Sequence, residues 1–187
     1  TVRLLVIVHG LCLNERHWAR DGDNRIEAVA VEHGYTPLYL RYNSGRSIAT
    51  NGREFADLLE TLLCHWPQPV QEVAIVGHSM GGLVARGAVH HGLAARHEWP
   101  RALSRLVFLG TPHHGAPLER GGHRLDYVME LSPYVAPFTR LGKSRSAGIT
   151  DLRYGSITED EQEFVPLPQH VECYALAATL GKRRSRV

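Results

Sequence analysis

Apolar runs alternate with stretches of helical periodicity along most of the chain. Five runs predict strands, at residues 2–8, 36–39, 73–76, 103–109 and 171–178. Those at 2–8, 73–76 and 103–109 contain few polar residues, which is typical of strands buried on both faces of a parallel sheet. The chain is therefore expected to place several of its strands in the interior.

Helical spacing predicts three helices between these strands. Residues from Ile26 to His33 are spaced as one helical face, and Gly34 is suited to cap its C-terminus. A second helix is expected behind a capping box of Asn51 and Glu54, and a third runs from Met80 to His91. Strands that alternate with helices favour right-handed crossovers and a mostly parallel α/β sheet with helices on both faces.

Residues 113–168 are less regular, and glycine, proline and basic residues are frequent there. We predict one domain over residues 1–187, with a core at 1–112 and 169–187 and an inserted cap at about 113–168. An amphipathic patch from Leu125 to Leu131 is expected to be either a lid that opens at a lipid surface or an ordinary helix packed on the core.

The composition is that of an ordinary soluble globular domain, with 43% hydrophobic and 21% charged residues. A formal net charge of +2 gives no indication of a nucleic-acid partner. No apolar run reaches the length of a membrane span and the first residues are not a signal peptide, which leaves compartment and oligomeric state open. Because the chain starts without Met on a predicted strand, we expect a processed or partial chain that is truncated at both ends.

The stretch Gly77-His78-Ser79-Met80-Gly81 joins a predicted strand to a predicted helix. In this context the Gly-x-Ser-x-Gly spacing predicts a nucleophile elbow, a sharp turn that exposes the Ser79 hydroxyl. Side chains at 77 and 81 would collide with neighbouring backbone, so both positions require glycine. The helix that follows directs its free N–H groups towards negative charge beside Ser79. The alternative interpretation is a tight turn with a capping serine.

A serine nucleophile also needs donors for the oxyanion that forms on acyl attack. The Met80 N–H, at the start of the helix, is one candidate. The Leu11 N–H is the other, because His9-Gly10-Leu11 ends the first predicted strand at the same edge of the sheet. Gly10 allows the backbone to turn close to the site, and His9 is expected to brace the loop rather than act as a base.

Three motifs together resemble the α/β-hydrolase lipases and esterases: Val8-His9-Gly10-Leu11, Gly77-His78-Ser79-Met80-Gly81-Gly82-Leu83-Val84, and Gly110-Thr111-Pro112-His113-His114-Gly115. Within that superfamily the chain is most similar to bacterial lipases and the GPI-inositol-deacylase-like group. The resemblance implies an α/β-hydrolase core that hydrolyses carboxylic esters, in particular lipid-like acyl esters, without a metal or organic cofactor. It also implies oxyanion donors at Leu11 and Met80, a variable cap over the pocket, and an ester or lipid substrate met in solution or at a lipid surface.

The catalytic base and acid are the open part of the site. The triad of this fold follows the order Ser, acid, His, and by resemblance the acid follows a strand like that at 171–178. We therefore expect the base and acid beyond Val187. The alternative places them within the chain, with His113 or His114 at the end of a strand and Asp126 or Asp151 as the orienting acid.

Two other functions would use the same pocket. An acyltransferase would pass the acyl group from Ser79 to an alcohol, and a pseudo-hydrolase would keep the elbow as architecture and bind a ligand.

A metal site is not expected, because the chain has no His-x-x-x-His or Cys-x-x-Cys pair. The three cysteines are expected to be buried free thiols. Residues 142–144 do not fit a P-loop, and the basic residues at 182–186 are expected to be solvated.

Overall fold

The protein is described here by a computed structural model that covers residues 1–19, 23–115, 146–160 and 165–177. Within them, five strands form one sheet in the order β2-β1-β3-β4-β5, and all neighbouring strands are parallel. The strands are β1 (Val2–Val8), β2 (Thr36–Leu40), β3 (Val70–His78), β4 (Leu103–Leu109) and β5 (Glu172–Leu176). The mostly parallel sheet predicted from the apolar runs is confirmed.

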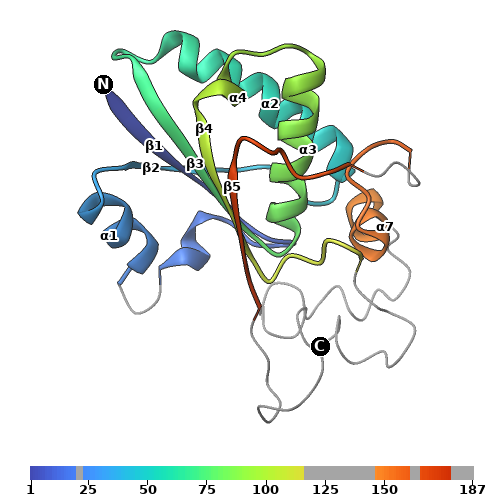
Figure 1. Cartoon of the computed structure of the whole chain (residues 1–187). Coiled ribbons are helices and arrows are strands. Elements are labelled where there is room, and N and C mark those ends of the chain that lie inside the picture. The colour runs from blue at the N-terminus through green and yellow to red at the C-terminus, as the bar shows by residue number, and fades with distance from the viewer. Residues whose placement is uncertain (20–22, 116–145, 161–164, 178–187) are drawn as a thin grey trace.

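Helices cover both faces of this sheet, as Figure 1 shows. One face carries α1 (Arg25–Glu32), and the other carries α2 (Ile48–His65) and α3 (Met80–Ala94), which pack on each other. Shorter elements are the 3-10 helix η1 (Glu15–Trp18) and the helices α4 (Trp99–Ala102) and α7 (Ala147–Tyr154). None of the described helices combines the length and apolarity needed to cross a membrane.

The alternation of side chains along β1 and β3 divides the core between the two faces. Val6, Val8, Val73 and Ile75 are buried with side chains of α2 and α3, whereas Leu5, Ile7, Ala74 and Val76 are buried with Ala30 of α1. Successive residues of a strand point to opposite faces, so an apolar run fills both layers at once. This explains why the central strands contain few polar residues.

The helix α2 begins at Ile48, before the predicted capping box of Asn51 and Glu54. That predicted capping box is therefore wrong. The Ser47 side chain accepts a hydrogen bond from the Thr50 N–H at 3.0 Å, and the Asp151 carboxylate accepts one from the Ile48 N–H at 2.7 Å. These groups satisfy amides that would otherwise lack partners at the start of α2. Asn51 lies inside the helix and is buried.

The described part of the predicted insertion contributes to the main core. Leu152 on α7, Ile157 and Val165 are buried in the same cluster as the side chains of α2 and α3. Gly148 brings α7 close to the loop before α2, because a Cβ there would lie 2.7 Å from the Arg46 carbonyl oxygen. The amphipathic patch, residues 142–144 and the basic residues at 182–186 lie outside the described residues.

Candidate active site

Ser79 lies where β3 ends and α3 begins. Its backbone has φ 52° and ψ −122°, a combination that residues other than glycine rarely adopt. The Ser79 N–H donates to the Leu109 carbonyl oxygen at 2.8 Å, so β4 fixes the turn at its strained residue. The side chain is half-buried, and its hydroxyl makes none of the bonds by which a serine normally caps a helix. These features are those expected of a nucleophile elbow.

Gly77 and Gly81 stand where backbone segments approach too closely for side chains. A Cβ on Gly77 would lie 2.5 Å from the Cα of Gly82, and a Cβ on Gly81 would lie 2.5 Å from the Val8 carbonyl oxygen. Both distances are shorter than van der Waals contact, so only glycine fits at either position. The second contact also fixes the start of α3 against the end of β1.

The structure brings the His9-Gly10-Leu11 loop against Ser79. A Cβ on Gly10 would lie 3.2 Å from the Cβ of Ser79. β1 and β3 are adjacent and parallel, so their carboxyl ends meet at this edge of the sheet. Met80 is fully buried directly after Ser79, and Leu11 is half-buried in the loop. The two backbone segments that carry the candidate oxyanion donors thus both lie next to Ser79.

His9 is buried, and both of its ring nitrogens have partners. Nδ1–H donates to the Gly10 carbonyl oxygen at 2.9 Å, which leaves Nε2 to accept the Tyr42 N–H at 3.5 Å. The Tyr42 hydroxyl donates to the His9 carbonyl oxygen at 2.7 Å, and the two rings stack with centroids 4.3 Å apart. Burial lowers the pKa of His9, which favours the neutral ring that these bonds require. In this arrangement His9 braces the loop.

His113, one of the alternative bases, contacts a cation rather than a carboxylate. Arg86 on α3 donates to its Nδ1 at 3.2 Å, and its ring packs edge-on against Phe108 with centroids 4.5 Å apart. Burial, and then the positive charge of Arg86, lower the pKa of His113 to about 4. A general base needs surroundings that stabilise its protonated form, and Arg86 has the opposite effect.

The other residues considered as an alternative base or acid differ in their environments. His114 is exposed, and the Asp151 carboxylate accepts the Ile48 N–H at the start of α2. Asp126 lies outside the described residues. A base and an acid beyond Val187 therefore stay a prediction, as does the His114 and Asp151 alternative.

The packing of Thr111, which the sequence places only within a motif at this edge of the sheet, and the involvement of Arg86 were not predicted. The Thr111 side chain covers Gly82, since a Cβ there would lie 2.8 Å from Thr111 Cγ2, and its buried Oγ1 has no hydrogen-bond partner among the described residues. Arg86 is partly buried on a helix otherwise rich in small and apolar residues. That isolated charge on α3 is the signal that sequence inspection offered.

The described residues form neither a metal site nor a disulfide. Within the described ranges, no cluster of three or more His, Cys, Asp or Glu side chains could hold a metal ion. Cys12 and Cys173 are free and half-buried, whereas Cys64 is free and exposed. The expectation of three buried thiols is therefore wrong for Cys64, which lies on the solvent side of α2.

The parallel sheet, the strained serine between β3 and α3, and the glycine loop beside it define an α/β-hydrolase fold of the lipase and esterase type. The sequence profile of the PGAP1-like alpha/beta domain matches residues 42–172. The chain belongs to that family. No curated protein sequence matched the chain.

Solved structures of bacterial enzymes share this fold. Mature Bacillus licheniformis lipase BlEst2 is 22% identical with a TM-score of 0.57, and the match covers 81% of this chain and 55% of that chain. Its propeptide form is 21% identical with a TM-score of 0.61, covering 94% and 36%. Phospholipase PlaB from Legionella pneumophila is 15% identical with a TM-score of 0.60, covering 93% and 38%. The chain thus spans about half or less of the length of these structures.

Proposed function

We propose that this chain is a serine hydrolase of carboxylic esters, with lipid-like acyl esters as its substrate class. The observation that supports this most directly is the backbone of Ser79, with φ 52° and ψ −122°. Strain of this kind persists only where the surroundings impose it, and it is concentrated at functional sites. The lipase and phospholipase that share the fold support a lipid ester as substrate.

In the proposed reaction, Ser79 Oγ attacks the ester carbonyl while a histidine expected beyond Val187 takes its proton. The carbonyl oxygen becomes an oxyanion that accepts hydrogen bonds from the Leu11 and Met80 amides. The C–O bond to the alcohol then breaks, the alcohol takes the proton from the histidine, and an acyl-serine is left. Water attacks this intermediate with help from the same histidine and releases the carboxylic acid and Ser79.

Hydrolysis of p-nitrophenyl esters with short and long acyl chains tests this proposal. Ser146→Ala is a matched control for Ser79→Ala, because Ser146 also precedes a helix and its hydroxyl also makes no capping bond. We expect the wild type and Ser146→Ala to hydrolyse the ester at the same rate. Ser79→Ala should lose at least about a thousandfold in kcat/KM.

Other outcomes of this assay would overturn the proposal. Turnover that persists in Ser79→Ala would remove Ser79 from the reaction. A folded wild-type protein that includes the residues expected beyond Val187 and still turns over no ester would favour a pseudo-hydrolase that only binds a ligand. Transfer of the acyl group to an added alcohol in preference to water would favour the acyltransferase.

A further inference from the structure

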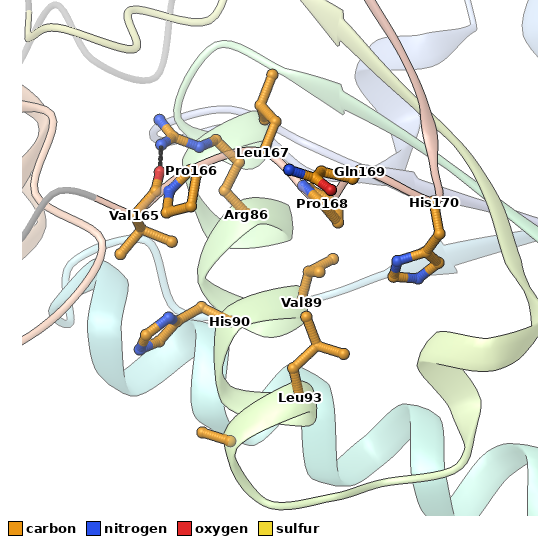
Figure 2. Close-up of a pocket in the computed structure, with 11 residues that line it drawn as sticks. Arg86, Val89, His90, Leu93, Val165, Pro166, Leu167, Pro168, Gln169 and His170 are labelled. Carbon is orange, nitrogen blue, oxygen red and sulfur yellow. Dashed lines mark hydrogen bonds between the residues drawn. The ribbon is translucent and has the colours of Figure 1, made fainter.

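A cavity of about 610 Å³ lies between α3 and residues 165–170, separate from Ser79. Its lining begins at Arg86 and follows α3 to Ala94, towards the end of the helix opposite Ser79. Figure 2 shows Val89 and Leu93 one turn apart on the helix, beside the segment that carries Val165. A cavity of this size is in the range of small-molecule binding sites.

Arg86 is the charged group among the described residues that line this cavity, and those residues supply only part of its hydrogen bonding. Its guanidinium donates to the Val165 carbonyl oxygen at 2.7 Å, drawn in Figure 2, and to His113 Nδ1 at 3.2 Å. A guanidinium has five N–H groups, and among the described residues the other three have no acceptor; Nε is one of them and is buried. Neither the carbonyl nor the neutral His113 balances the positive charge.

The lining offers no compensating negative charge. None of the described residues around the cavity is acidic, and besides Arg86 it is bordered by His90 and His170. Among the residues that the structure describes, this partly buried cation has no anionic partner, an arrangement that is energetically unfavourable, and burial accordingly lowers the pKa of Arg86. An anion that enters the cavity would supply the missing acceptors and charge, with the planar geometry that suits a carboxylate.

Apart from His90, Gln169 and His170, the rest of the cavity lining is apolar. Val89 and Leu93 line it from α3, and Pro166 and Pro168 line it from the opposite segment. From Arg86 to Leu93 the helix rises about 10 Å, a length that an extended acyl chain of about eight to ten carbons spans. The cavity thus has a cationic group at one end and, beside it, an apolar surface about as long as a medium acyl chain.

We propose that this cavity binds a medium-chain fatty acid, with the carboxylate on Arg86 and the acyl chain along Val89 and Leu93. The proposal does not depend on chemistry at Ser79, although a carboxylic acid is also a product of the reaction proposed there. It is therefore tested by binding alone, in the Ser79→Ala variant, so that its failure is distinguishable from failure of the proposed hydrolase activity.

Calorimetric titration of Ser79→Ala with decanoate below its micelle concentration is the direct test. We expect saturable binding of one decanoate per chain. Adding Leu93→Asp places a carboxylate in the part of the cavity proposed to hold the acyl chain, and it should weaken binding at least about tenfold. Leu58→Asp is the matched control, since Leu58 on α2 is 50% exposed and Leu93 is 48% exposed, but Leu58 does not line the cavity; it should leave binding unchanged.

Arg86→Gln tests recognition of the carboxylate, with the melting temperature measured to show that the variant is folded. We expect at least about tenfold weaker binding of decanoate, and decanol should bind the parent variant at least about tenfold more weakly than decanoate. Absence of saturable decanoate binding, equal effects of Leu93→Asp and Leu58→Asp, or equal affinity for decanol would overturn the proposal. Inorganic phosphate that binds as tightly as decanoate would also overturn it, because the acyl chain would then contribute nothing.

Discussion

The two ends of the central sheet are held together by different kinds of contact. At the carboxyl end, β1, β3 and α3 meet through backbone, and a Cβ on Gly77 or Gly81 would lie 2.5 Å from a neighbouring backbone atom. At the amino end, side chains join the strands. Glu72 on β3 accepts hydrogen bonds from Ser104 at 2.5 Å and from Arg3 and Tyr35 at 2.7 Å each, and it pairs with Arg105 at 2.5 Å.

The two ends of the sheet therefore have different physical requirements. The end that carries Ser79 depends on close backbone approach, so it tolerates no added atom but does not depend on charge. The opposite end depends on ionisation. Burial alone would raise the pKa of Glu72, but hydrogen bonds from Ser104, Tyr35 and Arg3 outweigh it and lower the pKa to about 2. Variants at the two ends should therefore affect activity and stability in different ways.

The largest effect is expected for Gly81→Ala. The new Cβ would lie 2.5 Å from the Val8 carbonyl oxygen, and relief requires a shift of β1 or of α3. We expect the free energy of unfolding in urea to fall by about 3 kcal/mol, with loss of ester hydrolysis.

Gly87→Ala is the control on the same helix, where the nearest atom to the new Cβ would be 3.3 Å away. Its unfolding free energy should stay within about 1 kcal/mol of the wild type, because a gain in helix propensity offsets the tighter contact. A Gly81→Ala protein that is both stable and active would contradict the close-packed account of the elbow.

Glu72→Gln should affect the other end of the sheet without affecting the reaction. We expect a loss of about 1–2 kcal/mol in unfolding free energy at pH 7, because several partners are partly exposed and screened. Ester hydrolysis should be unchanged. Glu54→Gln removes the exposed pair with Arg46 and should cost less than about 0.5 kcal/mol.

The effect of Glu72→Gln on the free energy of unfolding should depend on pH. Because the folded pKa of Glu72 lies below its unfolded value of about 4.5, its stabilisation is complete above about pH 4.5 and is lost as the pH falls towards 2. The difference in unfolding free energy between the wild type and Glu72→Gln should shrink over that range. A difference that is constant from pH 7 to pH 2.5 would show that the ionisation of Glu72 does not contribute.

Substitutions at Ser79 should reveal strain at the elbow. Glycine adopts positive φ without a steric penalty, so Ser79→Gly should be more stable than Ser79→Ala by about 1 kcal/mol in urea unfolding. The same pair of substitutions at Ser146, an N-cap with φ −66°, should differ by less. An equal difference at both positions would mean that the effect is one of helix capping rather than backbone strain.

The smallest effect is expected for Tyr42→Phe, which removes the hydrogen bond to the His9 carbonyl oxygen and keeps the ring stack. We expect kcat/KM for an ester to fall threefold to tenfold, by about 1 kcal/mol, since the loop beside Ser79 is less well positioned. Tyr39→Phe removes hydroxyl bonds to Asn24 and Glu27 on the α1 side and should leave kcat/KM unchanged. Equal losses in both variants would argue against a role for Tyr42 in the loop.

Features that depend on local sequence could be predicted, and for a physical reason. The strands β1 and β3 were predictable because apolar β-branched runs satisfy both faces of a buried sheet, and the elbow was predictable because glycine is needed on each side of Ser79. Parallel topology predicted that His9-Gly10-Leu11 lies at the same edge of the sheet as Ser79, and the structure adds that β1 and β3 are adjacent.

Features that depend on distant residues could not be predicted. The start of α2 is fixed in part by Asp151, about a hundred positions later in the chain, so the local pattern at Asn51 and Glu54 was misleading. The partners of His113 and the cavity beside Arg86 depend on how residues 165–170 cross α3. No local periodicity encodes such a contact.

Covalent labelling with a fluorophosphonate, followed by mass spectrometry of the digested protein, tests the central claim most directly. We expect one adduct per chain, located on Ser79, in the wild type and in Ser146→Ala, and none in Ser79→Ala. An adduct on another serine, or labelling that persists in a folded Ser79→Ala variant, would contradict the assignment of Ser79 as the nucleophile.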